Sequence, residues 1–199
     1  MLMYVGNLQT YQGIDMLLES FALALKNFKQ TDLVIIGGVE DDIHKYKQMS
    51  KELGIEKNVY FLGPKPVEHL AVYLSQADIL VSPRTKGRNT PMKVYSYLHS
   101  GKPLLATDMP THTQILDNKV AMLAAPSPQA YAEKMVELLA DQNLRTTLGK
   151  AGEQLIEDQY SYNAFRKKLN QLFDWLKVEI DDHGPTSGPV SYTSTTSTP

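Results

Sequence analysis

Leu33-Val34-Ile35-Ile36-Gly37-Gly38 is a run of four consecutive apolar residues that stops at two glycines. A short strand that is apolar on both faces is typical of the interior of a parallel sheet, because helices cover both of its sides. Similar runs alternate along the chain with longer segments whose apolar residues recur every three or four positions. These runs are 2–5, 59–62, 79–82, 104–106 and 120–123. The sequence therefore predicts an α/β fold with a doubly wound parallel sheet of about six strands.

Helices are predicted in the segments that join and follow the strands, at 14–28, 41–53, 67–76, 90–100, 111–116, 128–140, 142–158 and 163–180. The last helix has an apolar stripe opposite basic residues, which favours docking on the domain over contact with a membrane. One folded domain is predicted for 1–180. Over 181–199 the chain is rich in Ser, Thr and Pro, so it cannot bury enough apolar surface to offset its chain entropy. A flexible tail is expected there.

Composition excludes several classes of function. The 199 residues suffice for one complete domain, and 20 Lys and Arg against 22 Asp and Glu leave a net charge of -2. No overall basic field exists to attract nucleic acid, so any anion site must be local. The absence of cysteine excludes disulfides, thiolate nucleophiles and Cys-bound metals. Without a signal peptide or a run of about 18 apolar residues, a cytoplasmic location is expected, with membrane contact at most peripheral, at the inner face.

Ligands of such folds bind at the carboxyl ends of the strands, so the turns after each strand are the places to search. The turn from Pro83 to Lys93 follows a predicted strand and opens a predicted helix. Asn89 or Thr90 could cap that helix, and Pro91 suits its first position. The segment carries four cations, Arg84, Lys86, Arg88 and Lys93. Free amides at a positive helix end, with these cations, favour a phosphate site over the alternative of a capped helix with a solvated basic loop.

Other turns allow weaker inferences. The turn from Gly6 to Gly13 could bring Asn7 and Gln12 to the same ligand, or its glycines could serve the turn alone. The acidic cluster at 40–42 could bind a metal, although carboxylates in the first turn of a helix are more often stabilised by its dipole. His112 is interpreted as a surface or helix-start histidine, and the tyrosines as core residues.

Several familiar motifs are absent. No Gly-x-Gly-x-x-Gly follows the first strand, and Gly101-Lys102-Pro103 lacks the other residues of a phosphate-binding Walker loop. Gly63-Pro64 stands where a receiver domain would carry its phosphorylated aspartate, and no nucleophile elbow is visible. The sequence also has no Asp-x-Asp metal motif. These absences argue against a nicotinamide dinucleotide site, a P-loop enzyme and a serine hydrolase.

Five segments in order resemble the C-terminal, donor-binding half of family 4 glycosyltransferases, the retaining, Rossmann-like GT-B enzymes also called glycosyl transferases group 1. The resemblance covers about 1–178. Its segments are Tyr4-Val5-Gly6 with Gln12-Gly13-Ile14-Asp15, then Leu33-Val34-Ile35-Ile36-Gly37, Val59-Tyr60-Phe61-Leu62-Gly63, Ala77-Asp78-Ile79-Leu80-Val81-Ser82-Pro83, and Ser100-Gly101-Lys102-Pro103-Leu104-Leu105-Ala106-Thr107.

The resemblance also exposes departures from the family's pattern. Where the family has Gly-Arg-x4-Lys-Gly in the first turn, this chain has Asn7 and Gln12. The family's Glu-x7-Glu pair would fall on Arg88 and Ser96. The cations of the segment after the fourth strand can compensate, and the Pro91-x-Lys93 pattern resembles a variant found in some branches. A divergent donor site is therefore expected rather than a lost one.

The resemblance implies a nucleotide diphosphate sugar as donor, with no further cofactor and no metal. Its base would rest near Gly63 and Pro64, and its ribose near Ser96. The diphosphate would lie on the amides of the segment from Asn89 to Lys93. The other implied binding residues are Gly6, Asn7, Gln12, Arg84, Lys86, Thr90 and Met92. Arg88 and Lys93 would act catalytically by stabilising the charge on the leaving diphosphate.

In the family, the acceptor is bound by an N-terminal domain of comparable size, whereas this sequence opens at the donor domain's first strand. The expected partners are therefore a nucleotide sugar and an acceptor-binding half, present as a missing domain or a separate subunit, and no nucleic acid. The implied reaction transfers a sugar to a saccharide or lipid-linked acceptor with retention, and the chain alone should bind without transferring. The alternative is a non-catalytic module that binds nucleotide sugars or docks on proteins.

Overall fold

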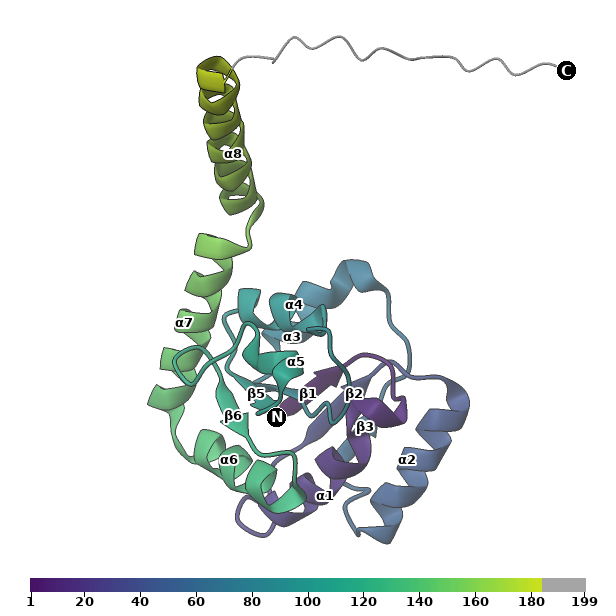
Figure 1. Ribbon diagram of the computed structural model, residues 1–199. Coiled ribbons are helices and arrows are strands. Elements are labelled where there is room, and N and C mark those ends of the chain that lie inside the picture. Colours follow the sequence, from purple (N-terminus) through teal and green to yellow (C-terminus); the bar gives the residue numbers. More distant parts are fainter. Residues whose placement is uncertain (184–199) are drawn as a thin grey trace, which may run out of the picture. The chain divides into compact units, whose positions relative to one another are not determined.

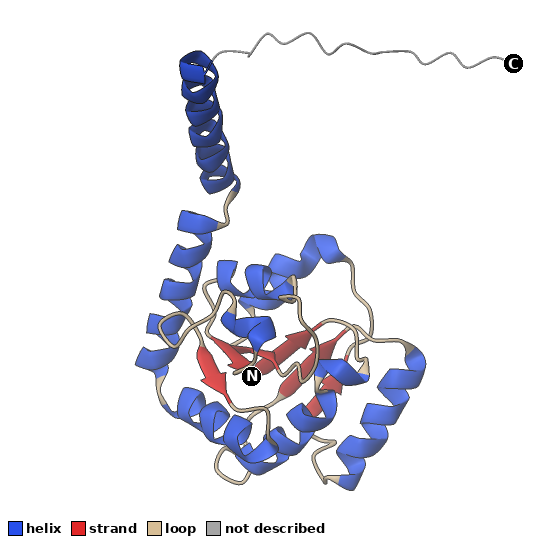
Figure 2. Ribbon diagram, viewed as in Figure 1, coloured by secondary structure: helices blue, strands red, loops and turns tan. Residues whose placement is uncertain are grey.

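The computed structural model describes residues 1–183 and contains a six-stranded parallel sheet (Figure 1 and Figure 2). The strands lie in the order β3-β2-β1-β4-β5-β6, and every pair of neighbours runs parallel. Their bounds are Leu2–Val5 (β1), Leu33–Ile36 (β2), Val59–Phe61 (β3), Ile79–Ser82 (β4), Leu104–Thr107 (β5) and Met122–Ala124 (β6). The predicted α/β, doubly wound architecture is confirmed.

Helices cover both faces of the sheet (Figure 2). The first face carries α1 (Ile14–Ala24), α2 (Glu40–Glu52) and α6 (Pro128–Ala140), and the second carries α3 (Leu70–Ser75) and α4 (Lys93–His99). The remaining elements of residues 1–160 are the 3-10 turns η1 (Thr10–Gln12) and η2 (Val67–His69) and the helices α5 (Pro110–Thr113) and α7 (Gln142–Gln159). The repeated strand–helix order produces this three-layer arrangement because a parallel strand needs a crossover on one face.

Side chains of the strands alternate between the two cores. In β1, Leu2 and Tyr4 belong to the core beneath α1, whereas Met3 belongs to the core beneath α4. In β4, Val81 belongs to the core beneath α1 and Leu80 to the core beneath α4. Since successive residues of a strand point to opposite faces, continuous apolar runs are required wherever both faces are covered.

Strand order reverses at β1, which pairs with β2 on one side and with β4 on the other. Chain connections leave toward opposite faces at such a point, so a crevice opens outside the carboxyl ends of the two strands. The turn after β1, residues 6–13, and the segment after β4, residues 83–92, therefore lie beside the same crevice. The sequence predicts both turns, and the strand order makes them neighbours.

The helix after the basic segment begins later than predicted. Helix α4 starts at Lys93, with Met92 at the N-cap, rather than at Thr90. The Thr90 hydroxyl donates to Oε1 of Gln114 and so does not cap the helix, and Pro91 precedes the first helical residue. Elsewhere the first helix ends at Ala24, and the predicted helix at 67–76 divides into η2 and α3.

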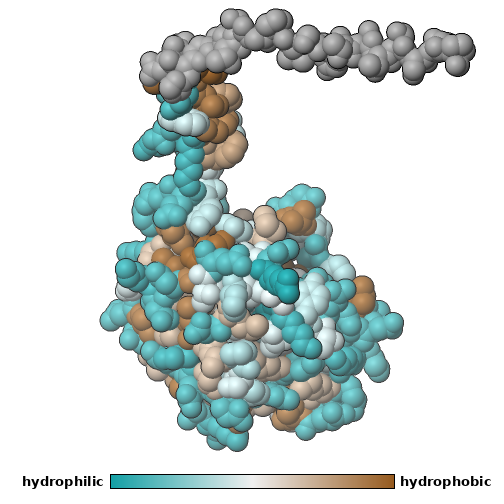
Figure 3. Space-filling model, in the orientation of Figure 1, coloured by the Kyte–Doolittle hydropathy of each residue, from teal (hydrophilic) through white to brown (hydrophobic). Residues whose placement is uncertain are grey.

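The described chain forms two compact units, of which the first is Met1–Tyr160. The second begins at Ser161 and contains α8 (Tyr162–His183). Apolar side chains gather along one side of α8 (Figure 3), as the predicted stripe requires. Residues 184–199, most of the predicted tail, lie outside the described residues. Within the described part of the chain, no helix has both the length and the apolar character to cross a bilayer.

Two glycines provide a test of the packing at the crevice. Gly13 and Gly54 have nearly the same left-handed backbone, with φ of 73° and 69°. A Cβ on Gly13 would collide with the carbonyl oxygen of Pro83, whereas a Cβ on Gly54 would meet open space. Gly54→Ala should lower the free energy of unfolding by about 1 kcal/mol through backbone strain. Gly13→Ala should lower it by about 3 kcal/mol, because overpacking adds to that strain.

Urea unfolding of both variants, followed by circular dichroism, measures this difference. Equal effects of the two substitutions would mean that the turn after β1 does not pack tightly against Pro83.

Candidate functional site

Lys93 reaches from the first turn of α4 to the end of β1. Its Nζ donates to the Tyr4 hydroxyl at 2.7 Å and to Oε1 of Gln12 at 3.3 Å. The same atom lies 3.9 Å from the centre of the Tyr4 ring, a distance at which the ring attracts a cation. Gly6 borders this contact, since a Cβ at that position would press against Nζ. The lysine is thus held by one strand, one turn and one helix.

Tyr97 explains why α4 places Lys93 there. It follows Lys93 by four positions and so lies on the same face of the helix. Its hydroxyl accepts from the amide of Val5 at 2.7 Å and donates to the carbonyl of Val5 at 3.1 Å. Burial raises the pKa of the Tyr97 hydroxyl, so that it remains a donor at ordinary pH. These bonds fix α4 to the last residue of β1.

The turn after β1 is organised by its own amide side chains. Oδ1 of Asn7 accepts from Nε2 of Gln12 at 3.2 Å, and Gln12 in turn accepts from Lys93. The Tyr4 hydroxyl donates to the backbone carbonyl of Asn7 at 2.6 Å. The turn therefore gathers Tyr4, Asn7, Gln12 and Lys93 into one hydrogen-bonded group, which we call the lysine cluster.

Arg84 lies beside this cluster. Its guanidinium is 5.1 Å from the centre of the Tyr11 ring, and the amide of Thr85 donates to the carbonyl of Tyr11 at 3.0 Å. Arg84 also donates from Nε to the carbonyl of Lys86 at 2.7 Å. The crevice therefore has two basic side chains, Arg84 and Lys93, along the turn from Gly6 to Gly13.

The lysine cluster has no counterion among residues 1–183. No described carboxylate lies within ion-pair distance of Lys93. Burial, with the nearby Arg84 guanidinium as a second cause, lowers the pKa of the Lys93 ammonium to about 7. Burial also raises the pKa of the Tyr4 hydroxyl, so Tyr4 cannot supply a negative charge. An anion bound here would restore the charged form of Lys93.

A cavity of about 380 Å³ opens at the carboxyl ends of the first three strands. The residues that line it include Gly6 and Asn7 after β1, Gly37 after β2, and Pro64 and Lys65 after β3. The amide of Gly37 donates to the carbonyl of Gly63 at 2.8 Å, which links two of these turns. The cavity thus adjoins the lysine cluster through Gly6 and Asn7.

The other predicted site residues lie farther apart. Ser96 lines a different cavity, of about 500 Å³, together with residues of η2, α3 and α4. The side chains of Lys86, Arg88 and Asn89 are exposed and make no hydrogen bond or ion pair within the described chain. Met92 is also exposed, and Thr90 bonds to Gln114. Of the two predicted catalytic groups, Lys93 therefore lies in the crevice, whereas the Arg88 side chain is exposed and makes no described hydrogen bond or ion pair.

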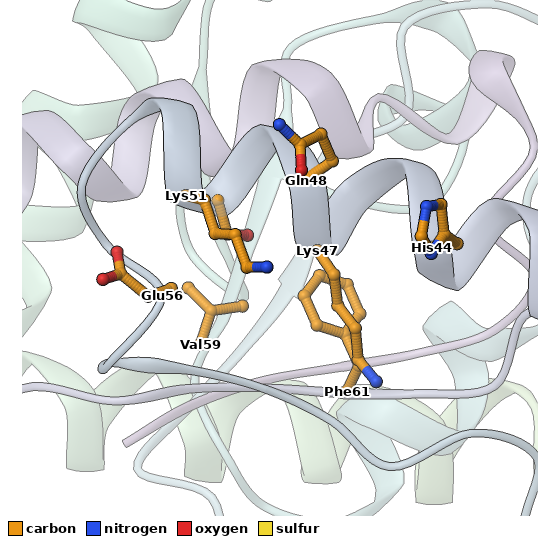
Figure 4. A pocket seen from close by; sticks show the side chains of 8 residues that line it. His44, Lys47, Gln48, Lys51, Glu56, Val59 and Phe61 are labelled. Atoms are coloured by element: carbon orange, nitrogen blue, oxygen red, sulfur yellow. The ribbon is translucent and has the colours of Figure 1, made fainter.

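A further cavity lies at the edge of the sheet rather than at the strand ends. It measures about 280 Å³ and is lined by side chains of α2, including His44, Lys47 and Lys51, and by Val59 and Phe61 of β3 (Figure 4). It contains no residue predicted for the donor site. The predicted dipole role of the acidic cluster fits its place in the first turn of α2. Among the described residues, no group of acidic or histidine side chains is arranged to bind a metal.

His112 corrects the sequence interpretation. It lies in the first turn of α5, as the helix-start alternative predicts, but it is fully buried, so the surface alternative is wrong. Its Nε2 lies 2.9 Å from the Ser82 hydroxyl, and its Nδ1 lies 2.9 Å from the Thr107 carbonyl. Burial lowers its pKa to about 4, which keeps the ring neutral at physiological pH. The sequence signal for this role is its position a few residues beyond β5, at the same edge of the sheet.

Sequence analysis also missed Tyr4 and Tyr11. The prediction that the tyrosines are core residues is wrong for Tyr60, Tyr160 and Tyr162, which are exposed. Tyr4 is core, as predicted, but its hydroxyl belongs to the lysine cluster. Tyr11 supplies a ring beside Arg84 and a carbonyl to Thr85. Tyr4 and Tyr11 each lie within two residues of Gly6 or Gly13, and that proximity to a candidate turn was the available signal.

The depressed pKa of Lys93 predicts a pH dependence of stability. The folded chain favours the neutral amine, so the unfolded chain binds more protons above pH 7 and stability rises with pH until about 10.5, the ordinary lysine value. Between about pH 7 and about pH 9.5 the gain from this group should be about 2–3 kcal/mol.

Lys93→Met should remove this contribution, and Lys150→Met, at an exposed position of α7, should keep it. Urea unfolding at several pH values measures the two slopes. A wild-type slope that Lys93→Met leaves unchanged would contradict the buried, unpaired state of this ammonium.

Comparisons of the sequence with known proteins agree on one family. The family model described as glycosyl transferases group 1 matches residues 1–155. A D-inositol 3-phosphate glycosyltransferase of Corynebacterium aurimucosum is 27% identical over 187 residues, which cover 90% of this chain and 44% of that protein. A phosphatidyl-myo-inositol mannosyltransferase of Mycobacterium leprae is 23% identical, over 82% of this chain and 43% of its own length. The chain thus spans less than half the length of these relatives.

Solved structures share the fold. The Anabaena protein Alr3699/HepE, solved in complex with UDP, has a TM-score of 0.76 at 16% identity, over 87% of this chain and 48% of that one. The C-terminal domain of LpcC, a glycosyl transferase group 1 family protein of Francisella tularensis, has a TM-score of 0.71 at 22% identity. That match covers 81% of this chain and 86% of the other.

Proposed function

Because the chain belongs to the glycosyl transferases group 1 family, we propose that it binds the nucleotide diphosphate sugar from which a sugar is transferred. Its sheet matches the C-terminal half of GT-B glycosyltransferases, so the fold and family expected from the sequence are confirmed. The observation that carries the proposal is the lysine cluster, in which Lys93 lies buried beside Arg84 without a described counterion. The anion in this proposal is a diphosphate, since arginine and lysine side chains commonly bind phosphate groups.

The proposed arrangement of the donor follows the strand ends. The diphosphate contacts Lys93 and Arg84 beside the turn from Gly6 to Gly13. The base rests near Gly63 and Pro64, at the cavity that Gly6 and Pro64 help to line. Such a cavity, of about 380 Å³, falls in the size range of small-molecule sites. UDP in the Anabaena structure supports a nucleotide as the ligand, although that protein shares only its fold with this chain.

In this proposal the leaving diphosphate is stabilised by fixed cations. Bond cleavage to the sugar leaves negative charge on the diphosphate, and a preorganised cation in a partly buried site lowers the energy of that state. Lys93 provides this charge directly, and Arg84 adds to the local field. Neither a metal nor a further cofactor is needed. The proposal that the sugar keeps its anomeric configuration rests on the resemblance to retaining enzymes.

Transfer requires an acceptor-binding half. The chain covers less than half of the length of its relatives, which supports a partner domain or subunit that binds a saccharide or lipid-linked acceptor. A second candidate is a non-catalytic nucleotide-sugar module. Neutral Asn7 and Gln12, with Arg88 and Ser96 at the family's glutamate positions, favour that alternative. A cytoplasmic location remains part of the proposal.

Calorimetric titration with UDP, GDP and ADP tests donor binding. At least one nucleotide should bind, more weakly at high salt, because charge carries the interaction. Lys93→Met should weaken binding by about 10- to 100-fold, the effect expected from the loss of one charge-assisted hydrogen bond. Lys150→Met should leave the affinity unchanged. Affinity should also fall as the pH rises above 7, because the ammonium of Lys93 loses its proton.

The absence of heat and of chemical-shift changes with all three nucleotides would reject the site. Binding that Lys93→Met does not weaken would place the nucleotide elsewhere on the domain.

A turnover assay separates binding from transfer. The chain mixed with a nucleotide sugar and saccharide acceptors should release no nucleoside diphosphate, since the acceptor-binding half is absent from the mixture. An assay coupled to nucleoside diphosphate release measures this directly, and steady release would show that the chain suffices for catalysis. Release that appears when an acceptor-binding half is added would favour the enzyme over the non-catalytic module.

A further inference from the structure

The basic loop, defined as residues 84–90, has little packing of its own. Lys86, Gly87, Arg88 and Asn89 are exposed. Gly87 has a φ of 128°, a conformation that other residues rarely adopt. A loop of this kind would sample many conformations unless other segments held it, and its charges would then be spread over many positions. The hydrogen bonds that hold it therefore decide how well its charges are placed.

Gln114, just after α5, holds the outer part of the loop. Its Nε2 donates to the carbonyl of Arg88 at 2.8 Å, and its Oε1 accepts from the Thr90 hydroxyl at 3.2 Å. The NH2 group of the Gln114 side chain thus donates to a loop carbonyl, and its oxygen accepts from a loop hydroxyl. The reverse orientation of the amide would place its oxygen against the carbonyl, so only one orientation makes both hydrogen bonds. Within the described chain, these are the hydrogen bonds that tie residues 86–90 to a distant segment.

A buried chain of hydrogen bonds holds the inner part. The Thr107 hydroxyl donates to the carbonyl of Arg84 at 2.6 Å. Nδ1 of His112 lies 2.9 Å from the Thr107 carbonyl, which can only accept, so this nitrogen carries the proton. The Ser82 hydroxyl then donates to Nε2 of His112 at 2.9 Å. The last residue of β4 and the segment after it are thereby bonded to α5 and β5, respectively.

We propose that Thr107, His112 and Gln114 form a clamp that holds the basic loop in the conformation that places Arg84 beside the lysine cluster, where the donor diphosphate would bind. The proposal rests on the proposed function and adds to it a set of positioning residues. Gln114 carries no charge and makes no contact with the lysine cluster, so it acts through the backbone of Arg88 and the side chain of Thr90. An ordered loop binds an anion more tightly because less conformational entropy is lost on binding.

Gln114 is the residue to test, because its side chain is exposed and its replacement should not disturb folding. Gln114→Met keeps the length of the side chain and removes both hydrogen bonds. Thr113→Ala is the matched control, since Thr113 is the exposed neighbour whose hydroxyl donates to the carbonyl of Met109, the N-cap residue of α5. His112→Asn, at a buried position, is a second variant to be measured only with an unfolding curve beside it.

Two measurements on the full chain decide the proposal. Without nucleotide, amide hydrogen exchange over 84–90 should be faster in Gln114→Met than in the wild type or Thr113→Ala. The affinity for the nucleotide that the wild type binds best should fall by about 5- to 20-fold, as expected for two neutral hydrogen bonds. The urea midpoint and the salt dependence of binding should stay unchanged, because the substitution removes neither a core contact nor a charge.

Unchanged exchange over the loop would overturn the clamp. Faster exchange with unchanged affinity would overturn the positioning role and leave Gln114 as a local structural contact. A wild type that binds no nucleotide would instead reject the proposed function, and the positioning role with it, whatever the exchange data show.

Discussion

The buried ammonium of Lys93 connects the parts of the crevice. It joins the end of β1, the turn that follows it and the first turn of α4 through hydrogen bonds to Tyr4 and Gln12. Burying a charged lysine costs free energy unless polar groups or a counterion interact with its ammonium. The protein supplies a hydroxyl, an amide oxygen and an aromatic face, but no described carboxylate. The positive charge of the Lys93 ammonium is therefore not compensated within the described chain, and a bound anion would compensate it.

Close approach of the strand ends provides the surroundings of that lysine. The amide of Gly6 donates to the carbonyl of Ile36 at 2.9 Å, and the amide of Gly37 donates to the carbonyl of Gly63 at 2.8 Å. A Cβ on Gly37 would collide with the carbonyl oxygen of Gly6, so the two turns can touch only where one of them lacks a side chain. Three turns that are distant in sequence thereby form one continuous edge. The cavity of about 380 Å³ lies at that edge.

The chain's departures from the expected family pattern become understandable in this setting. Asn7 and Gln12 stand where the resemblance implies arginine and lysine, and here they bond to each other and, through Gln12, to Lys93. Their amides position a cation that α4 contributes, so the charge of the crevice comes from a different element. Arg88, by contrast, contributes its backbone carbonyl to Gln114 and leaves its side chain exposed. The hydrogen bonds thus connect Asn7 and Gln12 to Lys93, whereas the Arg88 side chain makes no described hydrogen bond or ion pair.

The sequence by itself determined the strands, because a segment covered on both faces must be apolar throughout and only a few residues long. β1, β2 and β4 have the predicted bounds, and the turns after β1 and β4 were identified as candidate binding segments. Local patterns also identified Lys93 as one of four cations in the segment after β4. Tertiary structure alone decided that these two turns flank one crevice, that Lys93 is buried against Tyr4, and that His112 lies in the interior. Each of these features depends on strand order and on contacts between residues 30 to 89 positions apart. Periodicity and local propensity describe only residues that are near in sequence, so they cannot predict such contacts.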